Sequence, residues 1–547
     1  MSSIQVDRIM SERLFPKTKP TEDAVALSLI DATTVGFSAC SAIWFCDKSN
    51  RQQDGFDLTD HFRQSLKFAL DAYPQWTGHL KSIASLVSSE LPVESAKFAQ
   101  HARRYGRVYV HYGTSTDPGV EFVTAQSTAT LEMLCPASRP AEQPIYNRQA
   151  VPLNDLVPSV LIANAVRPKS VDEAGVLLPL MAVQLTQLAC GGFALSAKIS
   201  HPLADISSLV HFVKDWAAIS RWILSGSTGP APLLKPIFEP GQLDSMAAPD
   251  INAESPNPKF LKQAAALPLH RYDWWISTAG CPWGATIPEK FNSQEIHPVG
   301  TAMPWAEWDS KAHVSHYVIH LTYEQVETIW KAAIQGSPHE SGALRISRHD
   351  TILAHIWSCI ARARNQNEDS GPIHCDLTLG LRPALHLEER FVGSPNMMVN
   401  VEMSGTQLAS LKIPADERTR AISQSIRGTI NQLTRPAAIA AHLHSVAFET
   451  CPQRIWQAFL GSRHLLVTSW ARAGVYEVDF GLSESMIRYA EGVIADLDGC
   501  VLIKEAPPTQ NRDGSDGSWT DNGVDVSIHL REEDMERLIK DPLLLPQ

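Results

Sequence analysis

The chain has 547 residues, a formal charge of −12, and 44% hydrophobic and 19% charged residues. This composition is that of an ordinary globular protein, and the length exceeds one average domain of about 150 residues, so we expect at least two lobes with a sizeable core. The acidic balance argues against a general nucleic-acid or acidic-membrane binder, which usually carries a basic surface.

The N-terminal region predicts neither export nor membrane insertion. Residues 1–20 lack the apolar core of a secretory signal, and the most apolar stretch, residues 27–45, is interrupted by Asp31, Thr33 and Thr34. The nine cysteines form no CxxC pair and no Cys/His cluster at zinc-like spacing. We therefore expect a cytoplasmic protein with reduced thiols and no bound metal.

Strand-like and helix-like segments alternate along both halves of the chain. Strand patterns occur at residues 107–112, 181–188, 193–200, 316–321 and 475–480. Helical periodicity occurs at residues 66–72, 323–333 and 350–364. Before the last of these, Ser347 and Asp350 have the spacing of a capping box. The alternation predicts a mixed α/β protein of two lobes.

Residues 225–259 contain seven prolines and little helical or strand periodicity. Such a composition is typical of a connecting segment. We therefore predict an N-terminal lobe over residues 1–224, a proline-rich crossover over residues 225–259 and a C-terminal lobe over residues 260–547.

A predicted hairpin leads to the first candidate catalytic residue. Two strand patterns meet at Gly191-Gly192, a common hairpin turn signal, and His201 follows the second strand. By alternation His201 belongs with the apolar set Phe193, Leu195, Ala197 and Ile199. Its ring should therefore point inward, where burial lowers the pKa of an imidazole and keeps it neutral at pH 7. His201 is a candidate general base, and a core histidine without chemistry is the alternative that periodicity leaves open.

Asp205 stands where the next helical periodicity begins, so its carboxylate is suited to cap that helix. His211 and Asp215 repeat the same spacing ten residues later, on the polar side of the helix with Lys214. We interpret this second pair as a solvated i,i+4 pair without chemistry. The pair His201 and Asp205 is the candidate.

The segment from Gln184 through "HPLAD" at residues 201–205 resembles the first signature of the BAHD acyltransferases. The resemblance is closest to their fungal branch, which includes the trichothecene 3-O-acetyltransferases. Ile206 stands where a glycine commonly follows that signature. Weaker resemblances follow in the family's order at residues 27–31, 73–80, 346–364 and 379–398.

The second BAHD signature, DFGWG, is matched in part by "DFG" at residues 479–481. Leu482 and Ser483 replace its tryptophan and final glycine. The fungal branch tolerates variation at these places, so the departures do not by themselves imply inactivity.

The resemblance implies a chloramphenicol-acetyltransferase-like α/β fold of two lobes, the CoA-dependent acyltransferase fold, with an active-site tunnel between them. Acyl-CoA would enter from one mouth and the acceptor from the other. His201 would act as general base, and Asp205 would point away from the substrate and support the loop. Asp479 would be structural, with Arg382 as its candidate partner. The family needs no metal.

Candidate substrate-binding residues lie in the second half of the chain. Thr468 and Ser469 are candidate donors to the oxyanion of a tetrahedral intermediate, which needs positioned hydrogen bonds. Trp274 and Trp275 could form a wall for a bulky apolar acceptor, or could serve only the packing of the lobe.

These features predict an acyl-CoA-dependent O-acyltransferase that transfers acetyl or another short acyl group to a hydroxyl of a fungal specialised metabolite. Acyl-CoA would be a co-substrate and not a bound cofactor, and we expect a monomer that binds neither nucleic acid nor membrane. One alternative is a cyclase or isomerase that uses His201 as base without CoA. Another is a non-catalytic binding protein, suggested by Leu482 and Ser483.

Overall fold

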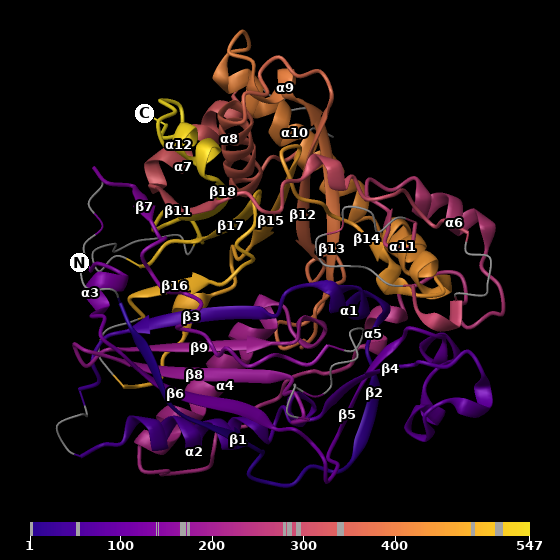
Figure 1. Ribbon diagram of the computed structural model, residues 1–547, viewed down its shortest axis with the longest axis vertical. Helices are drawn as coiled ribbons and strands as arrows, with labels where there is room; N and C mark the ends of the chain where they lie inside the picture. The colour runs from indigo at the N-terminus through magenta and orange to yellow at the C-terminus, as the bar shows by residue number, and fades with distance from the viewer. Residues whose placement is uncertain are drawn as a thin grey trace.

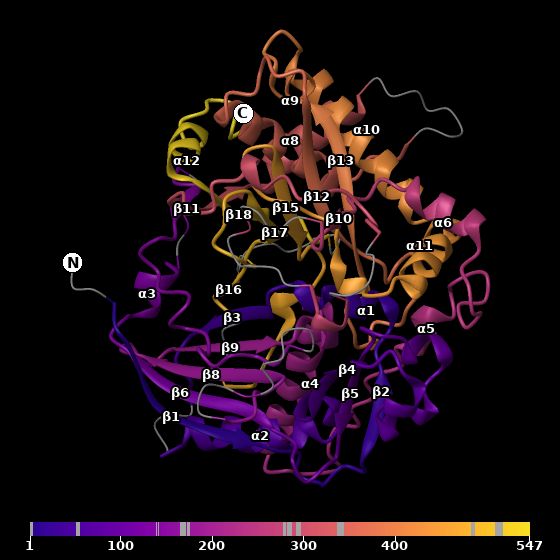
Figure 2. The ribbon, with the colours of Figure 1, turned by 45° about the vertical axis from the view of Figure 1, so that its right-hand side comes forward.

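The computed structural model describes residues 4–50, 55–137, 139, 142–164, 171, 175–276, 281, 287–291, 297–335, 344–482, 487–508 and 518–546. Two large sheets, each built mainly from one half of the chain, dominate the described part (Figure 1). Figure 2 shows the same two layers, with the C-terminal half above the N-terminal half. Between them α1 (Leu29–Thr33) contacts α11 (Pro436–Phe448).

The lower sheet has six strands in the order β1-β6-β8-β9-β3-β16. Their bounds are β1 Val6–Leu14, β6 Val120–Ser127, β8 Met181–Leu188, β9 Phe193–Ile199, β3 Cys40–Cys46 and β16 Tyr489–Gly492. Helices α2 (Leu58–Leu70) and α4 (Ile206–Leu224) contact each other and share one apolar core with this sheet. In that core Phe62, Trp44 and Trp216 are fully buried, which supplies much of the hydrophobic stabilisation.

The upper sheet has seven strands in the order β13-β12-β15-β17-β18-β11-β7. Their bounds are β13 Asn396–Ser404, β12 Pro372–Gly380, β15 His464–Ser469, β17 Cys500–Glu505, β18 Val524–Arg531, β11 Val314–Leu321 and β7 Ile145–Asn147. Its helices share a second apolar core with the strands. They are α7 Tyr323–Ile334, α8 Arg348–Ala363, α9 Gly405–Ala409, α10 Ala415–Leu433, α11 and α12 Glu532–Leu538.

Two smaller sheets complete the described strands. One is β2-β5-β4, formed by β2 Asp23–Ala26, β5 Val108–Tyr112 and β4 His79–Ser82, and the other pairs β10 (Tyr272–Asp273) with β14 (Ile455–Trp456). The remaining helices are α3 Leu131–Leu134, α5 Gly241–Asp244 and α6 Pro258–Ala265. Short 3-10 helices occur at Thr34–Gly36, Pro74–Thr77, Ser88–Glu90, Val93–Lys97, Gln100–Arg103, His201–Leu203, Glu289–Phe291, Trp305–Glu307, Pro452–Arg454 and Val475–Glu477.

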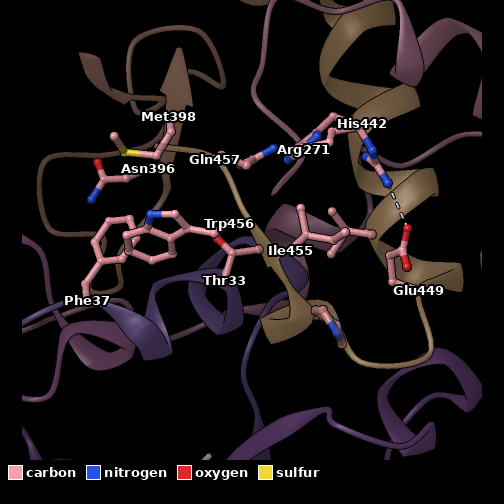
Figure 3. A pocket seen from close by; sticks show the side chains of 12 residues that line it. Thr33, Phe37, Arg271, Asn396, Met398, His442, Glu449, Ile455, Trp456 and Gln457 are labelled. Carbon is pink, nitrogen blue, oxygen red and sulfur yellow. Dashed lines mark hydrogen bonds and ion pairs between the residues drawn. The ribbon is translucent and has the colours of Figure 1, made fainter. Parts of the chain in front are cut away.

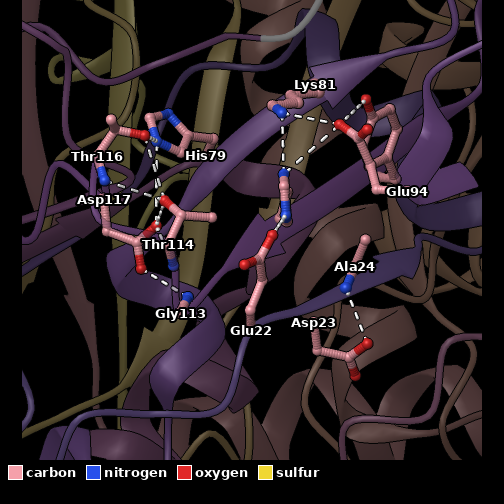
Figure 4. Close-up of polar contacts among 12 residues, drawn as sticks. Glu22, Asp23, Ala24, His79, Lys81, Glu94, Gly113, Thr114, Thr116 and Asp117 are labelled. Carbon is pink, nitrogen blue, oxygen red and sulfur yellow. Dashed lines mark hydrogen bonds and ion pairs between the residues drawn. The ribbon is translucent and has the colours of Figure 1, made fainter.

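A polar network covers one side of the β2-β5-β4 sheet (Figure 4). His111 lies 2.9 Å from the Lys81 Nζ and 3.0 Å from Glu22, and Lys81 donates to Glu94 at 2.9 Å. Glu22 is largely exposed, and ion pairs in contact with solvent contribute about 0–1 kcal/mol each. The network therefore ties the three strands together without dominating their stability.

Each large sheet also takes one strand from the other half of the chain. β16 lies beside β3 in the lower sheet, and β7 lies beside β11 in the upper one. The predicted crossover, residues 225–259, contacts both halves: Asp244 accepts from the Leu29 amide at 2.8 Å, and the Ile237 amide donates to Arg390 at 2.9 Å. The lobe boundaries at residues 225 and 259 stay a prediction. The two large sheets do not follow them strictly, because β7 and β16 each belong to the sheet of the opposite half.

Most predicted elements are confirmed. β5, β8, β9 and β11 correspond to the predicted strands, α7 and α8 to two of the predicted helices, and the third overlaps the end of α2. The capping box of Ser347 and Asp350 is present. None of the described helices has the length and apolar character needed to cross a membrane.

The predicted strand at residues 475–480 is wrong. The segment begins with a 3-10 turn that follows Gly474 in the left-handed region (φ 67°). The amide of Val475 donates to the Glu505 carboxylate at 2.9 Å, and its carbonyl accepts from the Trp44 indole at 2.9 Å. Because side chains satisfy the hydrogen-bonding groups of the Val475 backbone, the segment needs no strand partner there. Its apolar residues pack in the core of the lower sheet.

Candidate active site

His201 lies where the two halves of the chain meet. β9 ends at Ile199, and His201 opens a short 3-10 turn before α4. Its Nδ1 is 2.9 Å from Ser394 Oγ, which belongs to the other half of the chain, and its ring contacts Phe37 edge-on at 5.1 Å between centroids. Since His201 has left the strand, these contacts, and not strand alternation, set the direction of its ring.

The environment of His201 favours the neutral imidazole. Burial lowers the pKa of His201 below its ordinary value of 6.5, and the nearby charge of Asp205 offsets only part of that effect. In the tautomer whose Nδ1–H donates to Ser394 Oγ, the Nε2 lone pair of a neutral ring is free to accept a proton. The lowered pKa of His201 agrees with the neutral histidine expected from the sequence, and its catalytic role stays a prediction.

The pKa of His201 predicts the acid limb of the activity profile. If neutral His201 is the base, kcat/KM should fall as the pH drops through the lowered pKa, with a midpoint below 6.5, and should level off toward higher pH. Rates of acyl transfer measured between pH 5 and 8 test this, and a midpoint above 7 would contradict it.

Asp31 is the control for that profile. Burial raises its pKa to about 7, and it accepts a hydrogen bond of 2.6 Å from the Ser394 amide. The Asp31→Asn variant keeps an acceptor for that amide but cannot titrate. Its acid limb should stay below pH 6.5, whereas a limb that disappears would identify Asp31, and not His201, as the titrating group.

Asp205 supports the turn that carries His201. Its carboxylate caps α4 by accepting from the Ser208 amide at 3.0 Å, which confirms the predicted cap. Arg382 forms an ion pair with the same carboxylate and donates to Ser208 Oγ at 2.8 Å. The Gly393 carbonyl accepts from the Asp205 amide at 3.1 Å and from Ser208 Oγ at 2.8 Å. These contacts fasten the turn to the segment that presents Ser394.

The predicted pair of Arg382 and Asp479 is wrong. Arg382 is bound to Asp205 at the N-terminus of α4, whereas Asp479 lies 3.8 Å from Arg221 in the last turn of the same helix. A helix of 19 residues is about 28 Å long, so one arginine cannot serve both carboxylates. Asp479 is 66% exposed in its side chain, and Ser483 lies outside the described residues.

The second histidine and aspartate pair is less solvated than predicted. His211 Nε2 is 3.7 Å from Asp215 Oδ2, and both side chains are about four-fifths buried. Tyr73 donates to Asp215 at 2.7 Å, so the carboxylate holds α4 to the end of α2. Asp215 therefore has a structural role in joining the two helices.

A small hollow of about 30 Å³ lies between the two halves of the chain, and one of its lining residues, Phe37, contacts the His201 ring (Figure 3). Phe37, which contacts the His201 ring, also contacts Trp456 at 5.4 Å, and Asn396 donates to Ser394 at 3.3 Å. The lining residues are Thr33, Phe37, Arg271, Asn396, Met398, His442, Val446, Glu449, Pro452, Ile455, Trp456 and Gln457. They come from both halves of the chain and combine aromatic surface with the Arg271–Glu449 ion pair of 2.9 Å.

The predicted substrate-binding residues lie outside this lining. Trp274 packs on Trp305 at 5.5 Å, and Trp275 packs against Phe291 at 5.1 Å, which supports the alternative of lobe packing. Thr468 and Ser469 end β15 and are partly exposed. Their contribution to an oxyanion site stays a prediction.

The residues that sequence reasoning missed are Ser394, Asp31, Phe37 and Trp456. Ser394 and Asp31 reach His201 through contacts between distant segments, which no local pattern reveals. The sequence contained one sign of the role of Asp31: an aspartate inside an apolar stretch needs a specific partner when it is buried.

A sequence model of the Transferase family matches residues 114–240 and 289–545, well over half of the chain. Acyltransferase AFT15-1 of Alternaria alternata is 24% identical over 92% of this chain and 90% of its own length. Acyltransferase abl6 of Leptosphaeria maculans is 22% identical over 99% and 98%.

Solved structures are similar to this chain over nearly its whole length. F. graminearum TRI101 with ethyl coenzyme A has a TM-score of 0.61 at 14% identity, over 96% of this chain and 98% of its own. TRI101 with coenzyme A and T-2 mycotoxin has a TM-score of 0.60 at 15% identity, over 95% and 98%. Vinorine synthase has a TM-score of 0.57 at 14% identity, over 99% of both chains. The predicted two-lobed CoA-dependent acyltransferase fold is confirmed, and the chain belongs to the Transferase family, that of the BAHD acyltransferases.

Proposed function

We propose that this protein is an acyl-CoA-dependent O-acyltransferase that transfers acetyl or another short acyl group to a hydroxyl of a fungal specialised metabolite. The observation that carries the proposal is the half-buried His201 with its lowered pKa, held by Ser394 and in contact with Phe37 of the hollow. Two fungal relatives named acyltransferases, and a TRI101 structure that holds coenzyme A with T-2 mycotoxin, support the same chemistry.

In the proposed mechanism His201 Nδ1–H donates to Ser394 Oγ, which leaves the Nε2 lone pair free. Nε2 takes the proton of the acceptor hydroxyl while the oxygen attacks the thioester carbonyl, a step to which a general base contributes about 10²–10⁴ in rate. The tetrahedral intermediate then collapses, and the departing CoA thiolate takes the proton back from the imidazolium. Asp205 and Arg382 act as positioning residues, because their contacts fix the turn and not the substrate.

Release of free CoA thiol tests the proposal. The protein incubated with acetyl-CoA and a panel of hydroxylated fungal metabolites should release thiol in equal amount to an acetylated product, identified by mass spectrometry. Omission of the acceptor should suppress the release. Turnover of a metabolite without thiol release would favour a cyclase or isomerase, and binding without any turnover would favour a binding protein.

A further inference from the structure

Three metal-ligating side chains meet on one face of the upper sheet. Asp376 comes from β12, His464 from the start of β15, and His270 from the segment before β10. Their ligand atoms all lie within 4.8 Å of one another. A search of the sequence for ligands at short spacings does not find this group. Its three residues come from separate segments that only the fold brings together.

Among the described residues, no lysine or arginine pairs with the buried carboxylate of Asp376. It is 0% exposed, and among the described residues its ionic partners within 4 Å are the imidazoles of His270 and His464. Asp376 Oδ2 accepts from the Phe459 amide at 2.9 Å and lies 3.2 Å from His464 Nδ1. A carboxylate removed from water needs a compensating charge, which a neutral imidazole does not supply.

A second observation concerns the other carboxylate oxygen. Asp376 Oδ1 and His270 Nε2 are 3.2 Å apart, yet in the described part of the chain neither atom makes a hydrogen bond of acceptable geometry. Two buried polar atoms at this separation, without a hydrogen bond between them, are suited to be neighbouring ligands of one ion. In a tetrahedral site with metal–ligand bonds of about 2.0–2.2 Å, neighbouring ligand atoms are about 3.3 Å apart.

We propose that His270, Asp376 and His464 bind a divalent transition-metal ion of the zinc type. Two imidazoles and one carboxylate form a donor set that zinc accepts, with a fourth position left for water. The side chain of His270 is 12% exposed, which gives the ion a route of entry.

The site would fix one wall of the hollow. His270 precedes Arg271, which lines the hollow, and Tyr272, which pairs with the lining residue Trp456 between β10 and β14. Asp376 and His464 belong to the rigid sheet, so an ion would tie this wall to the sheet. His270 lies in residues 241–288, outside the segments that match the family, and the site is independent of the proposed acyl transfer.

Metal binding by the full chain tests the site. After removal of metal by a chelator and dialysis against Zn²⁺, the wild-type protein should hold one zinc per chain by elemental analysis and show a higher Tm than the chelated form. Co²⁺ should give visible bands of a nitrogen and oxygen site without a thiolate charge-transfer band. His270→Gln and Asp376→Asn should weaken zinc binding by more than the roughly 10–100-fold that loss of an outer-shell partner costs.

His211→Gln is the matched control, because His211 also lies beside a carboxylate, at 3.7 Å, but without a second imidazole. It should bind zinc like the wild type. His270 is the safer test variant, since its side chain lies in a connecting segment and not in a strand. Zinc content or Tm shifts in His270→Gln equal to those of the wild type would overturn the site, as would a wild-type protein that binds no zinc. Neither result depends on acyl transfer.

Discussion

Replacing His201 with alanine is expected to lower kcat/KM for acyl transfer by at least about 10²–10⁴-fold, the contribution of a positioned general base. The variant loses the group that accepts the hydroxyl proton in the proposed mechanism, while the residues that line the hollow are unchanged. Its fold should persist, because Asp205, Arg382 and Ser208 still fasten the turn. Single-turnover rates and circular dichroism of the same preparation measure both effects.

His211→Ala is the matched control for His201→Ala. His211 has the same spacing to an aspartate and contacts Asp215 within α4, whereas His201 precedes α4 and contacts Ser394 and Phe37 from other segments. Its removal should change kcat/KM little, and circular dichroism should show that the fold persists. Equal losses of activity in the two variants would mean that neither histidine is the specific base.

The local part of the site is predictable from the sequence because local rules build it. A Gly-Gly turn sets the β8–β9 hairpin, and an aspartate at the first turn of α4 caps it, so both features follow from short-range backbone chemistry. What holds His201 comes from far along the chain. Ser394 and its own support, Asp31, are brought together only by the docking of the two halves, and periodicity carries no information about that docking.

The effect of the departure from the second signature, DFGWG, also depends on contacts that the sequence pattern does not contain. Leu482, which replaces the tryptophan of DFGWG, is buried in the lower core, and its carbonyl accepts from the Asn50 amide at 3.1 Å. Gly481 adopts φ 71° and packs so closely on α4 that a Cβ would lie 2.9 Å from the Arg221 side chain. The loop therefore anchors the C-terminal end of α4, and an apolar side chain such as Leu482 preserves that packing. The substitution alone gives no reason to infer a protein without catalysis.

Loss of Arg382 should be the most destabilising of the single changes considered. In Arg382→Met the buried Asp205 carboxylate keeps its charge and loses its cation, and breaking a buried pair in this way costs about 3–5 kcal/mol. Arg221→Met removes the arginine beside Asp479, where both side chains are largely exposed, and should cost at most about 1 kcal/mol. Urea midpoints of the two variants, measured side by side, compare these losses.

The double variant Arg382→Met with Asp205→Asn separates charge from packing. If the cost arises from an uncompensated carboxylate, removal of that charge should restore part of the lost stability, and the asparagine oxygen can still cap α4. Activity should recover less than stability, because the link from the turn to the Gly393–Ser394 segment stays weakened. Equal losses in Arg382→Met and Arg221→Met would contradict this account, and so would a double variant less stable than Arg382→Met. The ends of α4 thus carry two ion pairs of the same chemistry, and burial decides which of them the protein depends on.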